Sequence, residues 1–313
     1  MEKKFKKILV TGGAGYVGTC TVDALLKNGY QVRVLDSLRF GGHGLLPFFQ
    51  NKNFEFIKGD IRDKKIVQAA MKDVDVVIHL ASIVGFPACR KDPELSREIN
   101  VGGTENIVEE AAGRPVLFAS TGSNYGKMLE KICTETVPLN PLTDYARQKS
   151  EAEEIIKKNR EFVIYRFATA FGVSPRMRLD LLPNDFTYRA VRDKSLIVYE
   201  KSFMRTFIHV RDMADSFVFA LANYDKMRGE IYNVGDNQMN YSKEGICNLI
   251  RQKVDYYLHF ADIGHDLDQR DYMVSYDKVH AVGFKPQISM EQGIDELINV
   301  SQLIEVQNPH YNA

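Results

Sequence analysis

Short runs of β-branched and other apolar residues alternate along the first half of the chain with longer stretches of helical periodicity. Six runs predict strands: Lys7–Val10, Gln31–Leu35, Phe54–Lys58, Asp75–Leu80, Val116–Ser120 and Phe162–Arg166. Four stretches predict helices: Tyr16–Asn28, Lys64–Met71, Glu94–Ala112 and Tyr145–Lys158. Several strands are apolar on both faces, which is typical of parallel strands covered by helices on both sides. We therefore predict an α/β fold with a doubly wound, mostly parallel sheet.

The pattern changes after Phe171. Residues 172–178 form a segment of turn formers that carries two arginines, Arg176 and Arg178. The remainder mixes helices with short predicted strands: Leu196–Tyr199, Thr206–Val210 and Ile231–Val234. We predict one domain over residues 1–171, which also receives part of about 205–235, and a smaller mixed α/β lobe over 172–313.

Charge and composition exclude several classes of partner. The 313 residues include 41 Lys and Arg and 41 Asp and Glu, so the formal net charge is zero and neither nucleic acid nor an acidic membrane surface is expected. No stretch approaches the roughly 18 apolar residues of a membrane span. Cys20, Cys89, Cys133 and Cys247 lack the spacing of a metal site or disulfide framework. We expect a cytoplasmic protein with reduced cysteines and no metal.

A glycine-rich loop follows the first predicted strand and leads into the first predicted helix. Residues 11–18 fit TGxxGxxG, and residues 13–18 fit GxGxxG. Such a loop lets backbone N–H groups approach a pyrophosphate, which the helix N-terminus attracts. The loop therefore predicts a Rossmann-type dinucleotide site that includes Gly12, Gly15, Tyr16, Val17 and Gly18.

Asp36 ends the second predicted strand, eighteen residues beyond Gly18. A carboxylate at this place can accept hydrogen bonds from both ribose hydroxyls of the adenosine. Its charge would repel a 2′-phosphate, so NAD is favoured over NADP. Arg39 lies nearby in the sequence and leaves NADP open.

Two further strand ends fit the same site. Asp60 and Ile61 follow the third strand, where a carboxylate can accept from the adenine amino group and an aliphatic side chain can cover the ring. The fourth strand ends in Leu80, Ala81 and Ser82, and the small residues there let the backbone approach the cofactor. We interpret the preceding His79 as a structural, hydrogen-bonded histidine.

A phenol and an ammonium lie on one helix face in the fourth predicted helix. Tyr145 and Lys149 are four residues apart, and Thr121 directly follows the fifth strand. A tyrosine ordinarily titrates near pH 10, and a neighbouring lysine and a positively charged nicotinamide ring lower that pKa. Tyr145 can then take the proton of a sugar hydroxyl while hydride leaves the same carbon, and Thr121 can bind that oxygen.

Together these motifs resemble the extended short-chain dehydrogenase/reductases of the nucleotide-sugar epimerase/dehydratase family. The resemblance covers nearly the whole chain. It is carried by Thr11–Gly18, Asp36, Gly59–Ile61, His79–Ser82, Asn100–Thr104, Ser120 and Thr121, Tyr125 and Gly126, Tyr145 and Lys149, Tyr165–Phe167, Arg205–Asp212, Tyr232–Gly235, and Lys278 with Gly283–Pro286.

The resemblance implies bound NAD and a catalytic set of Thr121, Tyr145 and Lys149, with Lys149 also holding the nicotinamide ribose and Asn100 belonging to the cofactor site. It implies a sugar linked to a nucleoside diphosphate as the substrate, bound largely by the C-terminal lobe. The candidate substrate residues are Thr169, Asn184, Arg205 and Arg270. It also implies a homodimer formed through the helices Glu94–Ala112 and Tyr145–Lys158.

The residues after Thr121 bear on the reaction. Dehydratases of the family carry acidic residues there, whereas this chain has Gly122 and Ser123. We therefore disfavour 4,6-dehydration, and the glutamate of the decarboxylases and the Cys/His pair of the 3,5-epimerases are also missing. Hydride exchange at sugar C4 remains, by a C4 epimerase or a 4-dehydrogenase. A 4-ketoreductase is an alternative, and a non-catalytic NAD-binding sensor is an alternative of another class.

Overall fold

A seven-stranded parallel sheet forms the larger part of the protein in a computed structural model, which describes residues 3–126, 132–261 and 273–304. The strand order is β3-β2-β1-β4-β5-β7-β11. The strands are β1 (Lys7–Thr11), β2 (Gln31–Asp36), β3 (Phe54–Lys58), β4 (Val76–His79), β5 (Val116–Thr121), β7 (Phe162–Phe167) and β11 (Glu230–Val234). The order runs outward in both directions from β1 and β4, so the switch point of the sheet lies between them.

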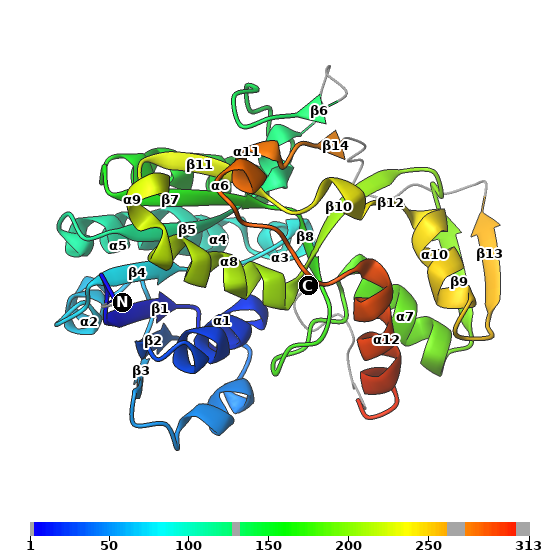
Figure 1. Cartoon of the computed structure of the whole chain (residues 1–313), viewed down its shortest axis with the longest axis horizontal. Helices are drawn as coiled ribbons and strands as arrows, with labels where there is room; N and C mark the ends of the chain where they lie inside the picture. Colours follow the sequence, from blue (N-terminus) through cyan, green and yellow to red (C-terminus); the bar gives the residue numbers. More distant parts are fainter. Residues whose placement is uncertain (1–2, 127–131, 262–272, 305–313) are drawn as a thin grey trace.

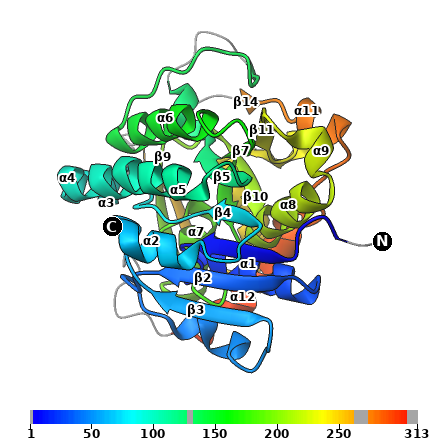
Figure 2. The same cartoon turned by 90° about the vertical axis from the view of Figure 1, so that its left-hand side faces the viewer.

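Helices cover both faces of this sheet (Figures 1 and 2). On one face lie α1 (Tyr16–Lys27) and α8 (Val210–Ala222), and on the other lie α2 (Lys64–Ala70), α5 (Gly103–Ala111) and α6 (Asp144–Lys157). Successive side chains of a strand point to opposite faces, so Ile8 and Leu9 of β1 are fully buried in two different cores. The predicted doubly wound fold is confirmed.

The predicted helix Glu94–Ala112 is divided in the structure. It consists of α4 (Pro93–Arg97), a π-helical turn η2 (Glu98–Gly102) and α5. Gly103 lets α5 approach the loop after β3, because a Cβ there would lie 2.4 Å from the side chain of Ile61. The wider turn also places Asn100 in the interior, where it is 2% exposed.

A second hydrophobic core holds the C-terminal lobe together. Its elements are α7 (Leu182–Arg192), α10 (Lys243–Arg251), α12 (Met290–Ser301) and the parallel pair β9 (Ser195–Tyr199) and β13 (Tyr257–Ala261). A small sheet joins the lobe to the rest through β8 (Thr169–Phe171), β10 (Met204–His209) and β12 (Asn240–Ser242). Of the strands between residues 205 and 235, β11 lies in the large sheet and β10 in this small one. The two-domain division stays a prediction.

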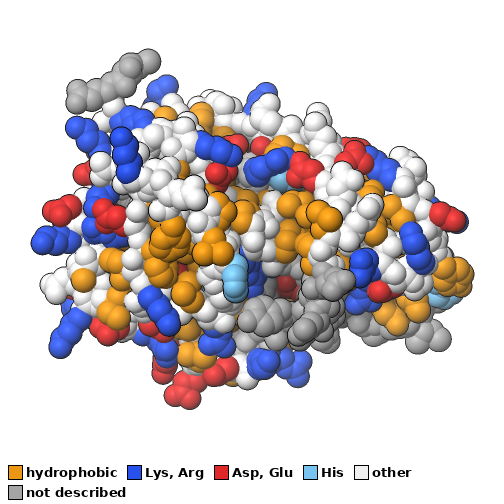
Figure 3. All heavy atoms as spheres, turned by 90° about the horizontal axis from the view of Figure 1, so that it is seen from below, with side chains coloured by type: hydrophobic (Ala, Val, Ile, Leu, Met, Phe, Trp, Pro, Cys, Tyr) orange, Lys and Arg blue, Asp and Glu red, His pale blue; other side chains and the backbone are white. Residues whose placement is uncertain are grey.

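The remaining elements are short. They are η1 (His43–Phe48), α3 (Phe86–Lys91), η3 (Gly122–Tyr125), β6 (Ile132–Cys133), α9 (Tyr224–Met227), η4 (Asn237–Met239), β14 (Met273–Val274) and α11 (Asp277–Ala281). Within the described ranges no helix combines the length and apolarity needed to cross a bilayer. The face in Figure 3 carries hydrophobic side chains near its middle and charged side chains of both signs mostly along its edges.

Candidate active site

A large cavity opens where the strands of the seven-stranded sheet end, between that sheet and the C-terminal lobe. Its volume is about 1040 Å³, and residues of both parts line it. Ligands of doubly wound sheets bind at this place, outside the carboxyl ends of the strands. Pockets for one drug-sized ligand range from about 300 to 1,000 Å³, so the cavity has room for a cofactor together with a substrate.

The glycine loop packs too tightly for side chains. A Cβ on Gly12, whose φ is 73°, would lie 2.7 Å from the backbone nitrogen of Ala81. A Cβ on Gly18 would lie 2.1 Å from the carbonyl oxygen of Gly12. Gly15 is the N-cap of α1 and lines the cavity with Tyr16, Val17 and Gly18, so the N-terminus of a twelve-residue helix faces this space. The arrangement fits a pyrophosphate, which would receive N–H groups and the positive end of the helix dipole.

Asp36 lies at the end of β2 and lines the same cavity. Its carboxylate accepts hydrogen bonds from the backbone N–H groups of Ala14 (2.9 Å) and Leu38 (2.8 Å). Burial raises the pKa of this carboxyl group, and the two N–H groups oppose that shift. A carboxylate offers about four lone pairs, so capacity remains for ribose hydroxyls.

The predicted adenine contacts also line the cavity, but Asp60 is already engaged. Its carboxylate pairs with the guanidinium of Arg62 at 2.9 Å and accepts from the Arg62 backbone N–H. Burial acts to raise the pKa of Asp60, and the contacts with Arg62 outweigh it and hold the pKa below its usual value. Ile61 is 4% exposed and lines the cavity beside Asp60.

The strand end at Leu80, Ala81 and Ser82 forms another part of the wall, and Asn100 holds it from behind. The Asn100 Oδ1 accepts from Ser82 Oγ (2.7 Å) and from the Ile83 N–H (2.8 Å), and its Nδ2 donates to the Ile83 carbonyl. Asn100 is not among the residues that line the cavity. The structure therefore places it as a support of the wall, and its predicted cofactor contact stays a prediction.

His79 is fully buried between two threonines. Its Nδ1 lies 2.7 Å from Thr11 Oγ1, and its Nε2 lies 3.0 Å from Thr104 Oγ1. Burial lowers its pKa to about 3, with a smaller contribution from Lys149. The imidazole is therefore neutral near pH 7, as expected of the structural histidine that the sequence indicated.

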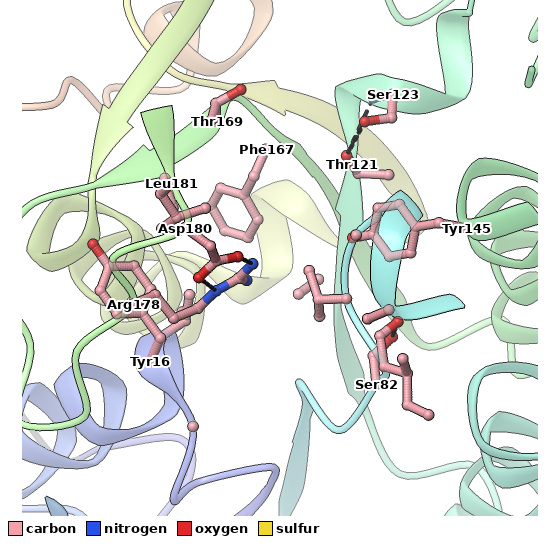
Figure 4. Close-up of a pocket in the computed structure, with 18 of the residues that line it drawn as sticks. Tyr16, Ser82, Thr121, Ser123, Tyr145, Phe167, Thr169, Arg178, Asp180 and Leu181 are labelled. Atoms are coloured by element: carbon pink, nitrogen blue, oxygen red, sulfur yellow. Dashed lines mark hydrogen bonds and ion pairs between the residues drawn. The ribbon is translucent and has the colours of Figure 1, made fainter. Parts of the chain in front are cut away.

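The three predicted catalytic side chains all line the cavity. Thr121 is the last residue of β5, and Tyr145 lies in the first turn of α6, which Thr143 caps by accepting from the Ala146 N–H. Figure 4 shows Tyr145 and Thr121 on the same wall. The Thr121 hydroxyl donates to Ser123 Oγ at 3.1 Å, so Ser123 is a further polar group at this wall that the motif did not identify.

Lys149 lies one turn further along α6 and is 4% exposed. Its ammonium donates to the carbonyl oxygen of Ala119 at 2.7 Å and lies 4.4 Å from the centroid of the Phe118 ring. Burial lowers its pKa to about 8, while the negative charge of Glu153 opposes the shift. The side chain is thus mostly protonated near neutral pH.

The predicted substrate residues are placed differently from one another. Thr169 and Arg205 line the cavity. Asn184 is fully buried, does not line the cavity, and bonds to the backbone of Gly172, where its Oδ1 accepts at 2.9 Å. A contact between Asn184 and a diphosphate stays a prediction and would require this side chain to turn away. Arg270 lies outside the described residues.

An ion pair that sequence reasoning missed faces the catalytic wall. Arg178 Nη2 lies 2.5 Å from Asp180 Oδ2, and both side chains are largely buried. Figure 4 shows this pair on the wall opposite Tyr145 and Thr121. The only sequence signal of this ion pair is the two arginines of residues 172–178. Nothing in the local sequence indicates that this segment lines the cavity.

Comparisons with known proteins show which family this chain resembles. The family model of the NAD dependent epimerase/dehydratase family matches residues 8–235. A UDP-glucose 4-epimerase of Halalkalibacterium halodurans is 31% identical over 78% of this chain and 79% of its own. A dTDP-D-glucose 4,6-dehydratase of Mus musculus is 27% identical over 94% and 88%. The structure of a Thermus thermophilus UDP-glucose 4-epimerase with NAD superposes with a TM-score of 0.83 at 25% identity, covering 95% of this chain and 99% of the other.

The matched family region contains the glycine loop, Asp36, Thr121, Tyr145 and Lys149. The family prediction and the prediction of NAD as the cofactor are thereby confirmed. Because both epimerases and dehydratases are among the relatives, the similarity does not by itself separate these two reactions. The chain belongs to the NAD-dependent epimerase/dehydratase family of nucleotide-sugar enzymes.

Proposed function

We propose that this protein is a nucleotide-sugar oxidoreductase that acts at sugar C4, most simply as a C4 epimerase. The proposal rests on one observation: Thr121, Tyr145 and Lys149 line the same cavity as the glycine loop and Asp36. The residues expected to bind NAD and those expected to transfer the proton therefore line one cavity. The UDP-glucose 4-epimerases among the relatives support the same assignment.

The chain supplies the proton transfer. Tyr145 takes the proton of the C4 hydroxyl and returns it to the keto oxygen, and its phenolate is stabilised by the nearby ammonium of Lys149. Thr121 holds the C4 oxygen by a hydrogen bond. NAD, when bound, supplies the hydride acceptor and donor for the carbon.

Water elimination receives no support from the residues next to Thr121. Gly122 and Ser123 both line the cavity, and neither carries an acid that could take the C5 proton or protonate the leaving hydroxyl. The carboxylates of the described cavity wall lie elsewhere: Asp36, Asp60, Asp180 and Asp185. This is why we favour epimerisation although dehydratases are among the relatives.

The cavity wall supports a nucleoside diphosphate sugar as the substrate. Arg205 is 6% exposed and lines the part of the cavity formed by the C-terminal lobe. Its guanidinium suits a diphosphate, because it can donate two parallel hydrogen bonds to phosphate oxygens.

Product masses distinguish the candidate reactions. The purified protein would be incubated with UDP-glucose, UDP-glucuronic acid and dTDP-glucose in D₂O and in H₂O, followed by mass spectrometry and proton NMR. A C4 epimerase gives a product of unchanged mass with inverted C4 and no deuterium on carbon. With NAD⁺ added, a 4-dehydrogenase removes two hydrogens from the sugar and forms NADH. With NADH and a 4-keto-sugar nucleotide added, a 4-ketoreductase adds two hydrogens to the keto sugar and forms NAD⁺.

Two other outcomes would contradict the proposal. Loss of water with deuterium at C5 identifies a dehydratase. Binding of NAD without turnover of any nucleotide sugar, and without a change of absorbance near 340 nm, would indicate the alternative class, a non-catalytic NAD-binding sensor. The presence of both Tyr145 and Lys149 at the cavity is what disfavours the sensor.

A further inference from the structure

Helix α6 carries a buried carboxylate that the proposed reaction does not use. Glu153 lies four residues after Lys149 and eight after Tyr145, so the three share one face of the helix. It is fully buried, whereas the next residue, Glu154, is exposed. A buried carboxylate requires partners that offset its desolvation.

The partners of Glu153 come from three other elements. Its Oε1 accepts from Ser120 Oγ of β5 at 2.5 Å and from Asn124 Nδ2 of η3 at 2.9 Å. Its Oε2 accepts from Arg166 Nη2 of β7 at 2.7 Å, in a pair whose members are 0% and 4% exposed. One carboxylate thus fastens the helix of Tyr145 and Lys149 to the two strands beneath it.

Two hydrogen bonds from α6 hold the end of β5, residues Ala119–Thr121. The carbonyl of Ala119 accepts from the ammonium of Lys149, and the next residue, Ser120, donates to Glu153. Thr121 follows directly and lines the cavity. The bond between Glu153 and Ser120 therefore joins the helix of Tyr145 and Lys149 to the strand end that carries Thr121.

Besides Glu153, few of the described residues near Lys149 carry a charge that could oppose or replace the effect of the Glu153 carboxylate. His79 of β4 is neutral near pH 7, because burial lowers its pKa to about 3. Cys89 of α3 is neutral as well, because burial raises the pKa of its thiol to about 11. The Phe118 ring of β5 also faces the ammonium, Tyr145 shares its helix face, and Arg166 lies beyond Glu153.

Stability alone gives little reason for such a pair. Well-packed hydrophobic residues often replace a buried ion pair with no loss of stability, so its presence asks for another role. We propose that Glu153 is a positioning residue for the C4 reaction: it holds Ala119–Thr121 in place against Tyr145 and places a negative charge one helical turn from the Lys149 ammonium. The proposal rests on the proposed roles of Tyr145 and Lys149. Burial lowers the pKa of Lys149 to about 8, and the Glu153 charge limits that decrease.

The test compares Glu153→Gln with Glu154→Gln. The first removes a buried charge at nearly constant shape, and the second removes an exposed charge, paired with Lys157, on the same helix. The kcat of the NAD-loaded enzyme would be measured against pH. Loss of the Lys149 proton should lower kcat at high pH and so produce the alkaline limb of the pH profile. We expect Glu153→Gln to lower the midpoint of this alkaline limb by about one pH unit, a roughly tenfold change in the proton dissociation constant. Glu154→Gln leaves the limb in place.

Two further measurements separate the effect of the Glu153 charge from that of its hydrogen bond to Ser120. Ser120→Ala keeps the charge and removes one hydrogen bond, so kcat falls while the limb stays. The rate at which Lys149 is acylated, followed against pH by mass spectrometry, reports its titration without turnover and also in Glu153→Asp, should Glu153→Gln fail to fold. Glu153→Asp keeps the charge but shortens the side chain, so its Lys149 titration stays near that of the wild type while kcat falls.

An unchanged Lys149 titration and an unchanged alkaline limb in Glu153→Gln would overturn the proposal, as would a shift in Glu153→Asp as large as that in Glu153→Gln. The proposed function fails separately, if Tyr145→Phe retains wild-type turnover, and the Lys149 titration would still be measurable in that case.

Discussion

The carbonyl oxygen of Gly12 occupies the place that a side chain on Gly18 would need, since a Cβ on Gly18 would lie 2.1 Å from it. Real Cβ contacts are never this close, and the clashing atoms belong to the backbone of the cofactor loop. The first turn of α1 can therefore approach the loop only while residue 18 has no side chain.

Gly18→Ala should abolish measurable NAD binding, because the loop must move away from α1 to admit the methyl group. Calorimetric titration with NAD measures this, and circular dichroism shows whether the fold persists. Gly102→Ala is the matched control, since nothing lies within 4 Å of its Cβ position. Wild-type affinity in Gly18→Ala would show that the loop does not hold the cofactor.

Tyr145→Phe should lower kcat by about 10²- to 10⁴-fold, the usual contribution of a positioned acid–base group. NAD binding should remain, because only a hydroxyl is removed. Turnover is followed by the product assay above, and Tyr257→Phe on β13 serves as a control because its ring is 66% exposed and lies outside the cavity. Equal rates in both variants would contradict the proposed mechanism.

Asp36→Asn should weaken NAD binding by roughly tenfold to a hundredfold, the range expected for hydrogen bonds to a charged group. It should also narrow the preference for NAD over NADP, because the charge that repels a 2′-phosphate is lost. Both dissociation constants would be measured by titration. Asp63→Asn is the control variant, because Asp63 is an exposed carboxylate at the N-cap of α2 that does not line the cavity. An unchanged NAD/NADP ratio in Asp36→Asn would remove Asp36 from the cofactor site.

Acid should destabilise the protein through its buried histidines. Burial lowers the pKa of His79 and of His209 to about 3, whereas an unfolded chain binds these protons near pH 6.5. Between these values the unfolded state binds more protons, so the free energy of unfolding falls as pH decreases from about 6.5 toward 3. Urea unfolding at several pH values measures the slope.

His79→Gln should reduce that slope, and His259→Gln, at an exposed position on β13, is the comparison variant. His79→Gln should also be less stable near pH 7, since the bonds to Thr11 and Thr104 are disturbed. A slope that is the same in all three proteins would mean that His79 titrates alike in the folded and unfolded states.

The sequence by itself determined the strands of the sheet and the dinucleotide loop, and it predicted NAD and the proposed catalytic set. Each depends on short-range patterns: apolar runs for the strands, the spacing of Gly12, Gly15 and Gly18 for the loop, and the four-residue spacing of Tyr145 and Lys149 on a helix. The strands of the large sheet begin and end within one residue of the predicted positions. In these elements the local pattern and the global fold agree, so the order of residues along the chain was enough to determine them.

Only the tertiary structure decided what the long-range partners do. Asn100 and Asn184 have the side chains of ligand-binding residues, but their bonds to Ile83 and Gly172 place them behind the cavity wall. The pair of Arg178 and Asp180 faces Tyr145 because the segment after β8 lines the opposite wall of the cavity. The spacing along α6 places Glu153 on the face of Lys149, but only the packing of Ser120, Asn124 and Arg166 around it shows what its carboxylate binds. These roles depend on which distant residues meet at one place, and no periodicity along the chain encodes such meetings.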